Sequence, residues 1–140
     1  MRHALFAALA AALLVRLSPA AAETKSEYEN RFQVMLDWAV RTDEFVHGHL
    51  GDRQLAAYAR NMAELNAREA ERMTPPAQYA ALHPHFLLVL ENIERSLSYA
   101  ADGKMERYRH FQKLMRKELQ LLEELAERAG IDLYRLGRGC

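Results

Sequence analysis

The chain has 140 residues, enough for one domain; half of them are hydrophobic and 27% are charged. These proportions are typical of folded globular chains and exclude wholesale disorder. Lys and Arg together number 19, as do Asp and Glu, so the chain lacks the basic excess that predicts binding to nucleic acid or to an anionic membrane surface.

The first 22 residues have the three-part layout of a secretory signal peptide. A short basic head precedes an apolar run over residues 4–15, and the alanines at 20–22 supply small side chains for cleavage. The apolar run ends at Arg16 after 12 residues, whereas a membrane span needs roughly 20. We expect cleavage after Ala22, with Ala20 as the alternative, and a mature protein that is periplasmic or secreted.

The mature chain is expected to form one helical domain over residues 23–130, followed by a C-terminal tail over residues 131–140. It has 17 basic against 19 acidic residues and no later segment that could span a membrane. The chain has one cysteine, Cys140, so no internal disulfide can form. Cys140 is interpreted either as an incidental thiol at a frayed end or as the site of an intermolecular disulfide.

Apolar residues at helical spacing predict two helices in the first half of the mature chain. The first covers residues 24–47 and ends before Gly48. The second covers residues 52–73, with Asp52 as its N-cap, and the prolines after Thr74 stop it. The predicted inner faces are Tyr28, Phe32, Met35, Leu36, Ala39 and Val46 on the first helix, and Leu55, Tyr58, Ala59, Met62, Leu65 and Ala70 on the second.

Two more helices are predicted in the second half. Pro84 is tolerated only in a first turn, so we expect a short turn over residues 77–82 and a main helix from His83 to about residue 101. The fourth helix covers residues 104–129. Glu118 falls inside its apolar stripe, and we expect it either to be functional or paired, if buried, or to reach the edge of the stripe.

Helices of this length joined by tight turns pack as antiparallel neighbours. The fold class is therefore predicted to be all-α, as an antiparallel up-down-up-down four-helix bundle in which the first and fourth helices are neighbours.

Five histidines remain after residue 22, and imidazole is a common ligand of transition metals. His47 and His49 form one H-x-H pair, and a second pair follows the second helix. That helix is about 22 residues or roughly 33 Å long, so the two pairs lie at opposite ends of the bundle. His110, early in the fourth helix, is expected near the first pair. His47, His49 and His110 are thus the candidate ligands of a transition metal, the alternative being that they are solvated.

Other chemistry is not indicated. A di-iron bundle needs two Glu-x-x-His motifs, and the sequence has one, from Glu44 to His47. We find no nucleophile turn and no Gly-rich phosphate loop, so the protein is interpreted as non-catalytic.

Three features of the second half resemble the cytochrome b562 family: Thr74 with its two prolines, an aromatic residue near the start of the third helix, and Ala100-x-x-Gly103-Lys104 before the fourth. The resemblance implies a periplasmic four-helix bundle. That family binds haem between a methionine early in the first helix and a histidine late in the fourth. Met35 is a counterpart of the methionine, but the fourth helix ends in LEELAERAG and has no histidine there. The resemblance therefore implies the fold and the compartment and not the haem.

Trp38 and Phe45 are seven residues apart and fall off the inner stripe of the first helix. They predict either an interaction surface or packing against a neighbouring helix. We therefore expect an exported binding or interaction module of the cell envelope, with a homodimer or an envelope protein as partner. The alternative is a metal- or haem-binding bundle.

Overall fold

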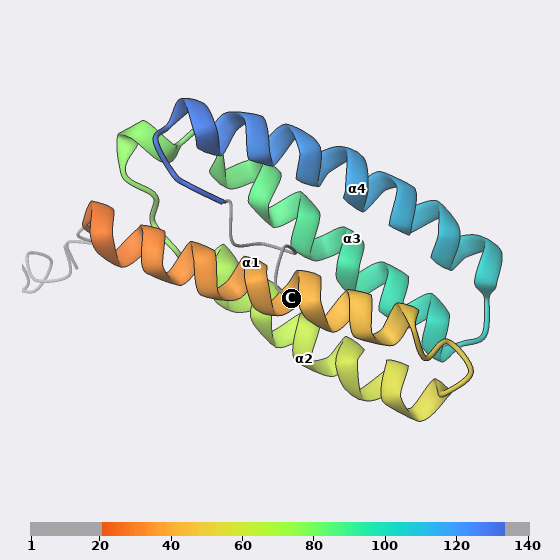
Figure 1. Cartoon of the computed structure of the whole chain (residues 1–140). Coiled ribbons are helices and arrows are strands. Elements are labelled where there is room, and N and C mark those ends of the chain that lie inside the picture. The colour runs from red at the N-terminus through yellow and green to blue at the C-terminus, as the bar shows by residue number, and fades with distance from the viewer. Residues whose placement is uncertain (1–20, 134–140) are drawn as a thin grey trace, which may run out of the picture.

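The computed structural model describes residues 21–133, and this range is helical without strands. It contains α1 (Lys25–His47), α2 (Arg53–Glu71), the short 3-10 helix η1 (Ala77–Tyr79), α3 (His83–Ala101) and α4 (Met105–Arg128). Successive long helices run in opposite directions (Figure 1), which confirms the predicted up-down-up-down four-helix bundle. The predicted signal sequence, apart from Ala21 and Ala22, and most of the tail, with Cys140, lie outside the described residues.

Local sequence signals set the ends of the helices. The Thr24 side chain accepts from the N–H of Glu27, and the Glu27 side chain accepts from the N–H of Thr24, so the pair forms a capping box at the start of α1. Asp52 accepts from the N–H of Leu55 at 2.9 Å and caps α2. Gly103 separates α3 from α4 at a φ of +73°, a conformation that favours glycine.

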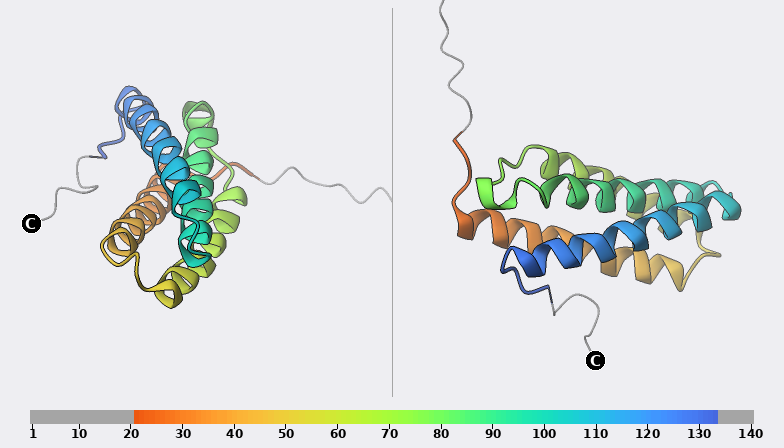
Figure 2. Two further views of the ribbon diagram at one scale, coloured as in Figure 1. Left: turned by 90° about the vertical axis from the view of Figure 1, so that its right-hand side faces the viewer. Right: turned by 90° about the horizontal axis from the view of Figure 1, so that it is seen from above.

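α3 is the central packing element of the bundle. It lies between α2 and α4 and contacts both extensively, whereas α1 contacts α2 and α3 more sparsely (Figure 2). Close backbone approach between α1 and α4 is minor, so side chains bridge this pair of helices. None of the helices in the described range has an apolar stretch of the length that a bilayer crossing requires.

The inner face predicted for α2 is wrong in part. Tyr58 is 67% exposed and Leu65 is 55% exposed. The residues that α2 buries are the small ones: Ala56, Ala59, Ala63 and Ala70. Alanines let the backbones of α2 and α3 approach closely, which explains why this face packs inward although its side chains are small. The larger apolar side chains are consequently left on the outer side of α2.

Candidate functional site

An apolar groove of about 620 Å³ lies between α1 and α2. We call it the α1/α2 groove. The side-chain amide of Asn66 donates to the backbone carbonyl of Met35 at 3.0 Å and ties the two helices together at the groove. Four polar side chains join five apolar ones in the lining, which consists of Asn30, Arg31, Val34, Met35, Trp38, Met62, Leu65, Asn66 and Glu69.

Five of the eight large apolar side chains that are exposed within residues 21–133 lie on the same two helices. Val34 and Phe45 on α1 are exposed, as are Tyr58, Met62 and Leu65 on α2. The three residues of α2 are spaced by four and three, so they share one face of that helix. A row of exposed apolar side chains next to a groove is a candidate binding surface.

The structure separates the two residues predicted to form an interaction surface. Trp38 is half-buried and lines the α1/α2 groove. Phe45 is 55% exposed, lies in the last turns of α1, and packs its ring at 4.4 Å from the ring of His49. Of the predicted pair, only Trp38 is therefore a lining residue of the groove.

The three predicted metal ligands each have another contact. His47 Nδ1 lies 2.7 Å from the Tyr108 hydroxyl, and His49 Nδ1 lies 2.7 Å from the backbone carbonyl oxygen of Phe45. His110 packs edge-on against the neighbouring ring of Phe111. No three or more His, Cys, Asp or Glu side chains within residues 21–133 are grouped so that they could hold a metal ion.

The second histidine pair lies at the opposite end of the bundle, as the topology predicts (Figure 1). His85 Nδ1 lies 3.1 Å from the Glu118 carboxylate, so Glu118 is paired and not a lone carboxylate in the stripe. His83 is buried, and its Nδ1 lies 3.0 Å from the Tyr28 hydroxyl. Burial lowers the pKa of His83, and the nearby Glu23 carboxylate offsets part of that effect.

A buried polar cluster joins α1, α3 and α4. Gln112 Nε2 donates to Asp43 Oδ1 at 2.6 Å, and the Ser96 hydroxyl lies 3.2 Å from the same oxygen. Burial raises the pKa of Asp43, while hydrogen bonds from Gln112 and Ser96 and the charges of His47 and Arg116 oppose the rise. Burial, with the Asp43 charge nearby, also raises the pKa of Tyr108 to about 12. The cluster holds three helices through one carboxyl group.

Sequence reasoning missed this cluster, although a signal was available. Asp43 lies four residues after Ala39 and three before Val46, so it occupies a position on the buried stripe of α1. Ser96 and Gln112 occupy equivalent positions on α3 and α4. One polar residue on each of three apolar stripes indicates that these residues meet in the core, since a buried polar group needs a partner.

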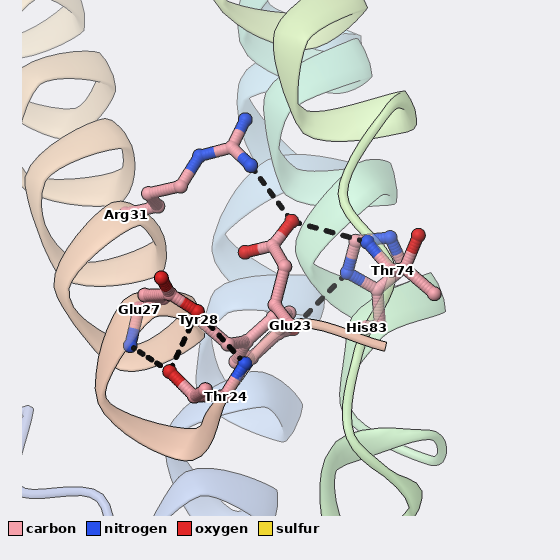
Figure 3. A network of polar contacts seen from close by, with 7 residues as sticks. All are labelled: Glu23, Thr24, Glu27, Tyr28, Arg31, Thr74 and His83. Atoms are coloured by element: carbon pink, nitrogen blue, oxygen red, sulfur yellow. Dashed lines mark hydrogen bonds and ion pairs between the residues drawn. The ribbon is translucent and has the colours of Figure 1, made fainter. Parts of the chain in front are cut away.

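A third feature holds the start of α1 against the linker that follows α2 (Figure 3). The Glu23 N–H donates to the carbonyl of Thr74 at 3.0 Å, and Glu23 Oε1 accepts from the Thr74 N–H at 3.2 Å. Arg31 Nη1 donates to the same carboxylate oxygen at 2.7 Å. We call these contacts the Glu23 clasp. It fixes the point at which the chain enters the bundle.

No protein-family model, curated protein or solved structure gives a significant match to this chain. The likeness to the cytochrome b562 family therefore remains a prediction from the sequence motifs.

Proposed function

We propose that this chain is an exported, non-catalytic binding module of the cell envelope, and that its α1/α2 groove receives an amphipathic helix of a partner protein. The observation that carries the proposal is the apolar groove with Trp38 in its lining and exposed apolar side chains beside it. Export rests on the three-part leader in residues 1–22.

The dimensions of the groove suit this role. Its volume of about 620 Å³ falls in the range of roughly 300–1,000 Å³ that is usual for small-molecule clefts, which is room for a few side chains on one face of a helix. Its lining is mainly apolar, with the polar side chains of Asn30, Arg31 and Glu69 at its edge. Arg31 also pairs with Glu23 and Glu69 with Arg72, so a ligand would compete with these two contacts. This combination of an apolar floor and a few polar groups is that of a binding site.

The spacing of the apolar residues favours a helix as the occupant. Val34 and Trp38 are one turn apart on α1, and Met62 and Leu65 are one turn apart on α2. Two neighbouring helices that present such rows form a groove into which a third helix lays its apolar face. Burying large side chains that are now exposed supplies the driving force, at roughly 1.5–3 kcal/mol for each one buried completely.

Site-specific photo-crosslinking in the exporting cell tests the proposal. A photoreactive amino acid at position 65 is expected to give a discrete protein adduct, because Leu65 lines the groove. The matched control is position 114, since Leu114 is an exposed leucine of α4 that is not part of the lining. Mass spectrometry of the adduct should place the crosslink on an amphipathic helix, and an adduct of twice the mass of the chain would identify a second copy as the partner.

The purified protein provides a second readout. Trp38 is the single tryptophan of the chain, so its fluorescence reports on the groove without a label. Adding the identified partner helix is expected to shift the Trp38 emission to shorter wavelength, and Leu65→Lys is expected to abolish the shift while Leu114→Lys leaves it unchanged. Equal adducts from positions 65 and 114, or no change in Trp38 emission, would contradict the proposal.

A further inference from the structure

Glu23 is the first residue after the predicted cleavage site, and the fold holds both its backbone and its side chain (Figure 3). Its N–H and its Oε1 contact the carbonyl and the N–H of Thr74, and Arg31 pairs with the same Oε1. The side chain is 16% exposed. Ala21 and Ala22, just before it, are exposed and outside any helix. The folded domain therefore begins at Glu23.

The other carboxylate oxygen of Glu23 lacks a partner. Among the buried side-chain polar atoms of residues 21–133, Glu23 Oε2 is the one with no hydrogen-bond partner. A buried carboxylate oxygen left without a donor destabilises a fold, and native structures almost always satisfy such atoms. The clasp thus lacks one donor next to the predicted cleavage site.

We propose that removal of the leader between Ala22 and Glu23 supplies this donor, so that the new α-ammonium of Glu23 completes the clasp. The proposal rests on the export proposed above. A leader peptidase uses one water molecule to hydrolyse the Ala22–Glu23 peptide bond. Ala22 leaves as a carboxylate, and the nitrogen of Glu23 becomes an amine that takes up a proton to form the ammonium.

The geometry around Thr74 favours this assignment. An amide nitrogen has one hydrogen, and that of Glu23 already bonds to the Thr74 carbonyl at 3.0 Å. An ammonium has three, so it can keep this bond and offer two more. The Glu23 nitrogen and Glu23 Oε1 both contact Thr74, so the carboxyl group lies beside its own backbone nitrogen. Oε2 belongs to the same carboxyl group, and the two further hydrogens of the ammonium are the donors nearest in the chain to it. A cation beside a buried carboxylate forms a charge-assisted hydrogen bond, which is stronger than a neutral one.

The proposal also selects between the two predicted cleavage sites. Cleavage after Ala20 would leave Ala21 and Ala22 attached and would keep an uncharged amide at Glu23. Only cleavage after Ala22 places the charge at the clasp. The mature, exported protein is therefore expected to begin with Glu23, which the mass of the intact protein will show.

A two-by-two comparison of purified proteins tests the role of the ammonium without requiring export. One protein begins at Glu23 and the other at Ala21, and each is also made with Glu23→Ala. The folding equilibrium constant from urea unfolding at pH 7 is expected to be roughly tenfold higher for the chain that begins at Glu23. In the Glu23→Ala pair this advantage is expected to disappear, because the carboxylate that the ammonium pairs with is gone.

Acetylating the α-amine of the chain that begins at Glu23 is the matched chemical control, since it removes the charge and keeps the sequence. It is expected to remove the tenfold advantage, as is raising the pH well above the usual α-amino pKa of about 8.

Equal stability of the chains that begin at Glu23 and at Ala21, or the same advantage in the Glu23→Ala pair, would overturn the role of the ammonium. A mature protein that begins at Ala21 would overturn the cleavage site. A protein that stays uncleaved in the cell while the two-by-two comparison succeeds would count against export alone.

Discussion

The side-chain amide of Gln112 donates a 2.6 Å hydrogen bond to the carboxylate of Asp43, and this contact links α4 to α1 across the interior of the bundle. Asp43 is 3% exposed and Gln112 is 4% exposed. The backbones of α1 and α4 make few close approaches, so the polar pair spans the space between them. Ser96 adds α3 to the same carboxyl group.

Replacing Asp43 tests what this contact contributes. Asp43→Ala is expected to lower the free energy of unfolding by about 1–3 kcal/mol, because Gln112 and Ser96 lose a buried acceptor. Asp43→Asn keeps an oxygen acceptor, so its effect is expected to be smaller. Urea unfolding measures both, with Asp37→Ala as the control, since the Asp37–Arg41 pair is exposed and worth little. An Asp43→Ala variant as stable as the control would show that the cluster does not hold the helices together.

The same carboxyl group predicts a pH dependence. Burial raises the pKa of Asp43 in the folded protein, so the folded state binds this proton more tightly than the unfolded state. The resulting stabilisation is complete below the ordinary pKa of about 3.9 and is lost as the pH rises through the raised value. The free energy of unfolding of Asp43→Asn, minus that of the natural protein, is therefore expected to increase above pH 4 and then level off. A difference that stays flat from pH 4 to pH 7 would contradict the raised pKa.

His83 predicts the opposite slope. Burial lowers its pKa, so the unfolded state takes up a proton first as the pH falls. The stability that neutral His83 contributes is present above the ordinary pKa of about 6.5 and is lost as the pH falls through the lowered value. His83→Asn keeps a polar atom near the Tyr28 hydroxyl and cannot take up this proton. The free energy of unfolding of His83→Asn is expected to fall less between pH 6.5 and pH 5 than that of the natural protein. If urea unfolding gives both proteins the same dependence on pH, the lowered pKa of His83 is refuted.

The orientation of α2 can be tested by substitutions on its two faces. Ala59 is buried in the packed face of α2, so Ala59→Leu is expected to destabilise the protein by about 1–3 kcal/mol through overpacking. Tyr58 is the next residue and is mostly exposed, so Tyr58→Ser is expected to change stability by no more than about 0.5 kcal/mol. Thermal unfolding of both variants distinguishes the faces. A loss of stability in Tyr58→Ser as large as that in Ala59→Leu would instead support the inner face predicted from the sequence, which included both residues.

The candidate groove was only partly predictable. Trp38 stood out because it falls off the inner stripe of α1, and it does line the groove. Leu65 was assigned to the core because hydrophobic periodicity favours large side chains as the buried ones. In the bundle the small alanines pack against α3 instead, since close approach of two backbones depends on the size of the side chains between them. Because apolar residues cover much of the surface of α2, the sequence alone did not decide which face of this helix is buried against α3.

The sequence by itself determined where the helices begin and end. Thr24 and Asp52 cap them, Gly103 and Pro84 interrupt or restart them, and each of these effects acts within a few residues of the chain. Only the tertiary structure decided that Asp43 meets Gln112, that Glu23 meets Thr74, and that α2 turns Leu65 outward. These contacts join residues far apart in the sequence, and they depend on how closely whole helices pack. The pattern along any single helix does not encode that packing, and only the comparison of three helices hinted at the Asp43 cluster.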